Sequence, residues 1–402
     1  MDKLTIVFHH AGGGHRNAAE AVRSTLTSRN PPWEVELLDI QQLLDQLDLI
    51  RRFTGIRIQD VYNQILRRGW TRPAPALLKI LLATIRIYHT PIVNVLRSYW
   101  AEHPTDMVLS VIPHFNREVS ESLRGSHGQS NSRATPFVTL ITDLADYPPH
   151  FWIERESEYI IAGTERARAQ ALALGHPADH VFLTSGMVLK PKFYDKQLLG
   201  GAAQTRIEER VRLGLDPDCK TGIVLFGGHG SKVMVDIVRR IDQSGADVQL
   251  ILICGHNQKL QAEIEALTTR KPKLVLGFTQ DVEHYMALAD FFIGKPGPGS
   301  ISEALQLHLP VIVECNKKTL PQERYNAEWV AEKGFGMVLP TFREIAPAVQ
   351  RLIEPGIFNE FLGNTNTYSN NALFEVAEIL EQCYDRAGIQ TFAQNVQAQP
   401  VL

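Results

Sequence analysis

The stretch from residue 291 to 326, FFIGKPGPGSISEALQLHLPVIVECNKKTLPQERYN, carries the strongest structural signal in the chain. An apolar strand ending at Gly294 leads into the loop GKPGPGS, whose three glycines and two prolines let the backbone turn sharply without crowding a ligand. A short helix follows, with Ser300 as its predicted N-cap, Glu303 three residues on and Pro310 beyond its end. The next apolar run is 311–313. The pattern predicts strand, glycine loop, helix and strand.

The amino end of that helix is a predicted anion site. Unpaired backbone N–H groups and the positive end of the helix dipole converge above the strand, an arrangement that suits a phosphate or pyrophosphate. A Ser-x-x-Glu pattern is also a common capping box, so Ser300 and Glu303 have a purely structural alternative. The extra glycines favour the ligand reading, since a cap needs only one. Glu303 could then accept hydrogen bonds from both hydroxyls of a ribose.

Size and composition set the frame for the rest of the chain. With 402 residues and 44% hydrophobic content, the chain is long enough for two cores, so we expect two domains. A net charge of −3 argues against a general nucleic-acid binder, which needs a basic face. The cysteines lie far apart without paired spacing, which indicates neither a zinc site nor a disulfide framework and fits a reducing cytoplasm. They are Cys219, Cys254, Cys315 and Cys383.

A second glycine loop follows the first predicted strand. Residues 4–8, LTIVF, read as a buried strand, and HHAGGGH then leads into a helix over about residues 16–28. Three successive glycines exceed what a turn requires, so Gly13 and Gly14 indicate close approach of a ligand. His15 falls at the first turn of the helix, where the dipole helps keep the imidazole neutral and able to take a proton. A polar cap is an equal alternative for His15. The chain starts on this strand without a charged leader, so we expect no export.

Residues 67–100 combine an apolar helical run with basic and aromatic side chains. Lys79 and Arg86 interrupt the run well short of the ~20 apolar residues that a membrane span needs. Such a helix can lie on an anionic membrane surface, or it can pack on its own domain as an ordinary amphipathic helix. The basic residues are Arg67, Arg68, Arg72, Lys79, Arg86 and Arg97, beside Trp70, Tyr88, Tyr99 and Trp100.

Two further strand regions, 106–115 and 136–152, end in polar residues. Ligands bind at the carboxyl ends of parallel strands, so these side chains are candidates for lining a cleft, although loop residues of this kind are more often simply solvated. The candidates are His114, Asp143, Asp146 and His150.

The strand-and-glycine pattern recurs after a polar stretch at 192–205, the predicted linker. The segments TGIVLFGGHGS, VQLILICGHNQKL and PKLVLGFTQDVEHYMALAD precede the stretch quoted first. We therefore predict an α/β protein of two Rossmann-like doubly wound domains facing across a cleft. The predicted divisions are 1–195, 196–370, a closing helix over 371–386 and a flexible tail over 387–402.

Familiar catalytic motifs are missing from the sequence. It contains no Walker loop, no Gly-x-Ser-x-Gly elbow and no His-Glu-x-x-His metal motif. Asp216, Pro217 and Asp218 match an Asp-x-Asp metal motif, but they fall in a predicted turn, and we interpret the match as chance.

Several segments taken together resemble one family. HAGGGHRNAAEAV, ITDLADYPPHFW, LFGGHGS, ICGHNQKL, VLGFTQDVEHYMALADFFIGKPGPGSISEAL and LPQERYN are similar, in this order, to the monogalactosyldiacylglycerol synthase and processive diacylglycerol glucosyltransferase group, and more distantly to MurG. The resemblance runs from residue 4 to about residue 380. It implies a GT-B glycosyltransferase that inverts anomeric configuration and passes a hexose from a UDP-sugar to a lipid acceptor, diacylglycerol being the expected one. It also implies a peripheral position on the cytoplasmic face of the membrane.

The resemblance also implies site residues. Gly297, Gly299 and Ser300 would hold the donor diphosphate, Glu303 the ribose, and the backbone near Phe278 the uracil. The donor side further includes Gly227, Gly228, Gln322, Glu323 and Asn326. His15 and Asp143 are the catalytic candidates, and Gly13, Gly14, His114 and His150 belong to the acceptor loops. An inverting transfer needs one base and fixed dipoles for the departing UDP, which a helix amino end can supply without metal, so no cofactor is expected.

Two departures from the family pattern touch the donor side, His229 in GGHG and Pro321 before the Gln-Glu pair. They leave the transferred hexose open. A UDP-sugar 2-epimerase, a transferase with another acceptor and a protein that holds UDP-sugar without turnover are the alternatives.

Overall fold

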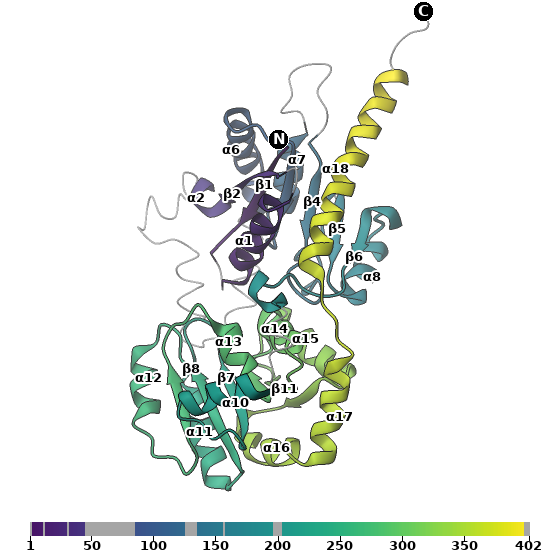
Figure 1. Ribbon diagram of the computed structural model, residues 1–402. Coiled ribbons are helices and arrows are strands. Elements are labelled where there is room, and N and C mark those ends of the chain that lie inside the picture. Colours follow the sequence, from purple (N-terminus) through teal and green to yellow (C-terminus); the bar gives the residue numbers. More distant parts are fainter. Residues whose placement is uncertain are drawn as a thin grey trace, which may run out of the picture. The chain divides into compact units, whose positions relative to one another are not determined.

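The computed structural model describes residues 2–10, 13–29, 32–44, 85–124, 135–155, 157–195 and 203–397, with side chains to residue 387. Two compact units result, and each is built on one sheet (Figure 1). Unit 1 comprises residues 1–190 together with 371–402, and unit 2 comprises 191–370. The predicted linker at 192–205 thus lies at the start of unit 2, where a 3₁₀ turn, Pro191–Tyr194, precedes the first helix.

Unit 1 contains a six-stranded sheet in the order β2-β1-β3-β4-β5-β6, and all of its pairs are parallel. Consecutive residues of β1, such as Ile6 and Val7, are fully buried, which requires cover on both faces of the sheet. The strands are β1 (Lys3–Phe8), β2 (Glu34–Asp39), β3 (Met107–Ser110), β4 (Phe137–Leu140), β5 (Tyr159–Ala162) and β6 (Val181–Leu183). The helices are α1 (Gly14–Thr27), α2 (Ile40–Leu44), α6 (His89–Glu102), α7 (Asn116–Leu123), α8 (Glu165–Ala173) and α18 (Ala372–Gln397), with a 3₁₀ turn at Ala178–His180.

The last helix, α18, returns to unit 1 and packs against α1 (Figure 1). Arg29 donates to both carboxylate oxygens of Glu381 at 2.7 Å, and the rings of Trp33 and Tyr384 meet edge to face at 5.2 Å. The closing helix predicted for 371–386 is therefore longer than expected. The tail predicted from residue 387 is wrong as far as Gln397, because the helix continues to that residue.

Unit 2 contains a second parallel sheet, in the order β12-β11-β10-β7-β8-β9. If β7 is counted as strand 1 and the sheet is read from β9 to β12, this is the order 3-2-1-4-5-6 of the dinucleotide-binding fold. Strand order reverses between β7 and β10. The strands are β7 (Lys220–Leu225), β8 (Val248–Ile253), β9 (Lys273–Leu276), β10 (Phe291–Gly294), β11 (Val311–Glu314) and β12 (Gly336–Leu339). The helices are α10 (Ala203–Arg212), α11 (Val233–Ser244), α12 (Gln258–Glu265), α13 (Val282–Ala287), α14 (Pro298–Gln306), α15 (Pro321–Glu332), α16 (Ile345–Leu352) and α17 (Pro355–Asn366), with a 3₁₀ turn at Phe342–Glu344.

The predicted α/β class of two Rossmann-like doubly wound domains is confirmed. Strands β2 and β12 were not among the expected strands. Both lie at a sheet edge and are only partly buried, so neither forms the continuous apolar run that marks a central parallel strand.

The helix predicted within residues 67–100 is described from residue 85 onward, and residues 67–84 lie outside the described part. In α6, Ile92, Leu96 and Trp100 are buried in the core of unit 1. The Trp100 indole donates to Ser122 Oγ at 2.8 Å, and the Tyr99 hydroxyl donates to Glu36 at 2.7 Å. Two of the aromatic residues expected at a membrane surface thus hold α6 on its own domain. Among the described residues, no helix is long and apolar enough to cross a membrane.

Candidate active site

The glycine loop of unit 1 follows β1, at the point where strand order reverses between β1 and β3. Gly13 has a left-handed φ of 81° at the start of α1, where no side chain caps the helix. A Cβ added at Gly13 or Gly14 would meet no atom of the described residues within 4 Å. Glycine is therefore needed at 13 for its backbone conformation, whereas the space beside residue 14 is open to a ligand.

His15 points from the first turn of α1 into a group of aromatic side chains. Its Nδ1 lies 3.0 Å from Thr142 Oγ1, which comes from the loop after β4. Its ring centroid is 4.5 Å from that of His9 and 5.6 Å from that of Trp152. The sequence prediction placed His15 correctly at the helix start but missed His9, Thr142 and Trp152.

Three imidazoles in this region have lowered pKa values. Burial lowers the pKa of His15 to about 4, although a hydrogen bond to the Val111 backbone acts in the opposite direction. Burial also lowers the pKa of His114 to about 4, with a contribution from His15, and it lowers that of His9 well below the usual value. His15 is therefore neutral near pH 7, and burial is the main cause rather than the helix dipole invoked from the sequence.

Asp143 belongs to the same region through Trp152. Its Oδ2 accepts a hydrogen bond of 2.8 Å from the Trp152 indole, and its side chain is buried. Trp152 is itself fixed at both backbone groups. Its N–H donates to Asp146 Oδ1 at 2.7 Å, and its carbonyl accepts from Asn116 Nδ2 at 3.0 Å. The fold thus places a neutral imidazole and a buried carboxylate next to the same indole.

The other three loop candidates have different environments. Asp146 accepts hydrogen bonds from the backbone N–H groups of His150, Phe151 and Trp152, so its carboxylate shapes the loop. His150 is exposed and is bound through that backbone contact. His114 has a left-handed φ of 65°, its ring meets Phe151 at 4.5 Å, and its buried Nδ1 has no hydrogen-bond partner among the described residues.

In unit 2, the loops after β7 and β10 meet at the reversal of strand order, since Leu225 and Gly294 are paired neighbours. Gly227 has a left-handed φ of 73°. The carbonyl of Gly228 accepts a hydrogen bond of 2.9 Å from the N–H of His256, in the loop after β8. A Cβ at Gly255 would approach that carbonyl oxygen to 2.2 Å, so only glycine fits there. Open α/β sheets bind ligands at such a crevice.

Helix α14 begins differently from the prediction. It starts at Pro298 with Gly297 as its N-cap, and no side chain caps it. The predicted N-cap role of Ser300 is therefore wrong, because Ser300 is already the third helical residue. Proline at the first helical position is preorganised for a helix and lacks only an N–H that would be unpaired anyway. Within the described part of the chain, a Cβ at Gly299 would meet nothing within 4 Å, so the described residues leave space at the amino end of α14.

Helix α15 brings the Gln-Glu pair and Asn326 to the same loop. Glu323 Oε1 accepts a hydrogen bond of 2.7 Å from Lys295 Nζ, inside the glycine loop. Asn326 is fully buried, and its Nδ2 donates to the Pro296 carbonyl at 2.8 Å. That carbonyl fixes the orientation of the amide, and its Oδ1 is buried without a partner among the described residues. Gln322 and Glu303 are partly buried, in α15 and in the second turn of α14 respectively.

Phe278 follows β9 with 55% of its surface exposed and stacks on His256 at 4.0 Å, with 14° between the ring planes. His256 in turn lies 5.9 Å from His229, in the loop after β7. The three rings stand at the carboxyl ends of β7, β8 and β9, one from each loop. The expected uracil position near Phe278 therefore has a flat aromatic surface that the sequence did not reveal.

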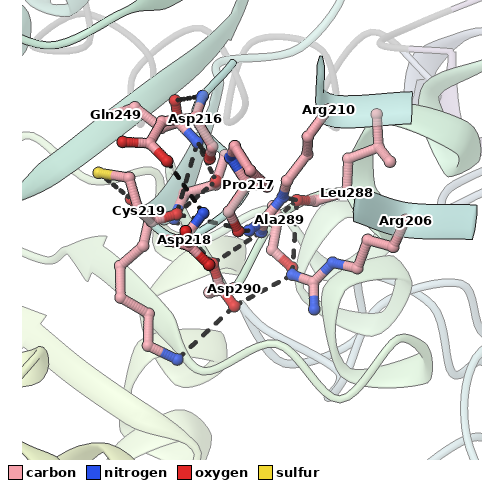
Figure 2. A network of polar contacts seen from close by, with 12 residues as sticks. Arg206, Arg210, Asp216, Pro217, Asp218, Cys219, Gln249, Leu288, Ala289 and Asp290 are labelled. Carbon is pink, nitrogen blue, oxygen red and sulfur yellow. Dashed lines mark hydrogen bonds and ion pairs between the residues drawn. The ribbon is translucent and has the colours of Figure 1, made fainter. Parts of the chain in front are cut away.

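A polar network lies at the opposite end of the same sheet, where β7, β8 and β10 begin (Figure 2). Asp290 accepts from Arg210 at 2.8 Å, from Arg206 at 3.1 Å and from the Thr221 N–H at 2.7 Å. Asp218 N–H donates to Asp216 Oδ1 at 3.0 Å, which closes a tight turn. The Asp-x-Asp match is thus part of a structural turn, and no cluster of metal-ligating side chains occurs among the residues with a described position.

Comparison with known proteins identifies one domain of the chain. Residues 222–379 match the glycosyltransferase family 28 C-terminal domain. The chain is a glycosyltransferase with this domain. Monogalactosyldiacylglycerol synthase 2, chloroplastic, of Arabidopsis thaliana is 26% identical over 363 residues, which cover 86% of this chain and 72% of the relative. The resemblance stated from the sequence motifs is confirmed.

Two solved structures share the fold. MurG of Acinetobacter baumannii has a TM-score of 0.64 at 13% identity, covering 95% of this chain and all of MurG. UDP-GlcNAc 2-epimerase of Neisseria meningitidis, bound to UDP-GlcNAc, has a TM-score of 0.59 at 16% identity, covering 94% of this chain and all of the epimerase. The GT-B fold class is therefore confirmed, and these two likenesses extend no further than the fold.

Proposed function

We propose that this glycosyltransferase moves a hexose from a UDP-sugar to a lipid hydroxyl, that of diacylglycerol, with inversion at the anomeric carbon. The supporting observation is that both sheets carry an open glycine loop where strand order reverses, one beside a neutral histidine and the other at an uncapped helix amino end. The similarity to monogalactosyldiacylglycerol synthases over most of the chain supports the lipid acceptor.

Unit 2 is the proposed donor side. The diphosphate would accept hydrogen bonds from the backbone at Gly297, Gly299 and Ser300, where the helix dipole of α14 favours negative charge. Glu303 would accept from the ribose hydroxyls, and the uracil would lie by Phe278. Gly227 and Gly228 would face the donor from the loop after β7, while Gln322, Glu323 and Asn326 would contact the sugar.

Unit 1 is the proposed acceptor side. Gly13 and Gly14 leave room for the acceptor, and His15 would take the proton from its hydroxyl. Asp143 is the rival base, and His114 and His150 would belong to the acceptor loops. The hydroxyl oxygen bonds to the anomeric carbon as the bond from that carbon to the diphosphate breaks, and the electron pair leaves with UDP. A base and fixed dipoles suffice for this step.

Incubation with a panel of UDP-sugars, with and without diacylglycerol vesicles, tests the proposal. We expect UDP release that depends on the lipid, together with a glycolipid product. Conversion of a UDP-sugar to its 2-epimer without lipid would select the epimerase instead. Binding of UDP-sugar with no turnover under any condition would select a binding protein.

A further inference from the structure

Lys295 lies between two loops of unit 2, the one after β7 that contains Gly227 and the one after β10 that contains Gly297. It is the second residue of GKPGPGS, directly after β10. A Cβ added at Gly297 would lie 3.5 Å from Lys295 Cε and 3.9 Å from its Nζ, and a Cβ at Gly227 would lie 4.0 Å from Cε. The lysine chain therefore passes beside both backbone turns that face the strand-order reversal.

The ammonium group of Lys295 is held rather than free to rotate. It donates to Glu323 Oε1 at 2.7 Å, and the Glu323 side chain is only 12% exposed, whereas that of Lys295 is 46% exposed. Asn326, one helical turn after Glu323, ties the same loop through the Pro296 carbonyl. A largely buried carboxylate thus holds the ammonium group of a partly exposed lysine beside the glycine loop.

An ammonium in this position adds a cationic group beside the partial positive charge of the α14 amino end, with the Glu323 carboxylate offsetting part of its charge. Two phosphates bound at that end would carry more negative charge than a helix dipole offsets, and lysine is a common point-charge partner for phosphate. We propose that Lys295 binds the donor diphosphate and stabilises its charge as the sugar leaves, with Glu323 as the positioning residue. This inference rests on the proposed function and names the side chain that stabilises the negative charge left on the diphosphate.

The chemistry balances without another reactant. When the bond between the anomeric carbon and the diphosphate oxygen breaks, both electrons stay on that oxygen, and the acceptor proton passes to the base in unit 1. Lys295 keeps its proton throughout and acts through charge. Its effect grows with the number of phosphates on the ligand, whereas a structural ion pair at the surface contributes little and is indifferent to the ligand.

The test compares UDP with uridine by calorimetry, in the full chain and in Lys295→Gln. We expect UDP affinity to fall about ten- to hundredfold, the range for one lost charge-assisted hydrogen bond, and uridine affinity to change less than about twofold. Lys295→Arg keeps the charge and should retain most of the UDP affinity. Lys271→Gln is the matched control, since Lys271 pairs with Asp247 where β8 and β9 begin, at the opposite end of the same sheet.

Three results would overturn the assignment. One is unchanged UDP affinity in Lys295→Gln, another is an equal loss for UDP and uridine, and the third is an equal loss in Lys271→Gln. A failure of the proposed UDP-sugar donor looks different, because the parent chain would then bind neither UDP nor uridine, whereas an epimerase or a binding protein would still bind UDP. Thermal unfolding of each variant confirms that the fold is intact, and if Lys295→Gln fails to fold, a tenfold loss in Lys295→Arg would equally overturn a role carried by charge.

Discussion

The loops after β1 and β10 share one backbone design and carry opposite chemistry. Each follows a strand at the reversal of strand order, and each leads into a helix without a side-chain cap. The first contains and adjoins imidazoles with lowered pKa values, and the second contains the ion pair of Lys295 and Glu323. The comparison teaches that the fold supplies the same uncapped helix end twice, and that the neighbouring side chains give each end a different chemical character.

Replacing His15 with Gln should produce the largest effect, because it removes the proposed base while keeping a polar side chain of comparable reach. Turnover should fall about 10²–10⁴-fold, the usual range for a general base, while UDP binding survives on unit 2. Rate measurements and calorimetry on the same preparation check both parts. His10→Gln is the control in the same loop, since His10 is exposed and contacts Asp39 at 3.3 Å.

The pH profile sharpens the test of His15. Protonation inactivates a base, and burial lowers the pKa of His15 to about 4, so the acid limb of the parent rate should lie well below the usual histidine range. Near-parent turnover with the same acid limb in His15→Gln would make His15 structural. The base would then have to be sought at Asp143 or His150.

Glu303→Ala should weaken donor binding on the other loop. The loss of one hydrogen bond to a charged group costs about 1.5–3 kcal/mol, which is roughly ten- to hundredfold in affinity. Because Glu303 does not cap α14, the fold should remain intact. Calorimetry with UDP decides the point, and Glu360→Ala, an exposed helical glutamate in α17, serves as the control. Unchanged UDP affinity would leave Glu303 without a ligand role.

The lowered imidazole pKa values also predict an acid sensitivity in unit 1. The pKa of His114 is lowered to about 4 in the folded state, so between about pH 6.5 and 4 the unfolded chain binds more protons, and stability falls as pH falls. The cost is at most about 1.4 kcal/mol per pH unit for each such group. His89, whose pKa is raised mainly by its hydrogen bond to Glu118, acts in the opposite direction.

The contribution of His114 is therefore measured as the difference in stability between the parent and a His114 variant. Thermal unfolding of the parent and of His114→Gln between pH 7 and 4 should show a shallower loss of stability in the variant. His180→Gln is a comparable substitution elsewhere in unit 1, at a ring that bonds the Glu158 carbonyl at 3.0 Å. Parallel curves for the parent and His114→Gln would contradict the predicted proton linkage.

The smallest expected effect concerns residues 67–100, the basic and aromatic segment of unit 1. It tests whether unit 1 binds a membrane surface that carries the lipid acceptor. Each Lys or Arg near an anionic membrane is worth about 1 kcal/mol, so replacing Arg67, Arg68 and Arg72 with Ser should weaken cosedimentation with anionic vesicles. Salt should weaken the parent in the same way. If cosedimentation at low ionic strength is unaltered, surface docking fails, and the packed helix already seen for α6 accounts for the segment.

Much of unit 2 could be predicted from local sequence, because central parallel strands form continuous apolar runs and glycine loops end them. The strand ending at Gly294, the helix after it and the next strand all lie close to where the sequence placed them. The exact helix start could not be predicted, since Ser-x-x-Glu and Gly-Pro both signal a beginning and only backbone geometry chooses between them.

The sequence by itself determined the central strands of both sheets, the two glycine loops and the position of His15, since these depend on residues adjacent along the chain. Tertiary structure alone decided three further features: that Trp152 joins Asp143 to the His15 region, that Glu323 reaches Lys295, and that α18 packs on α1. These partners are far apart in sequence, so no spacing or periodicity encodes them. The first two sets of partners meet because parallel strands bring their carboxyl ends, and the loops that follow, to one end of the sheet, whereas α18 and α1 meet by helix packing.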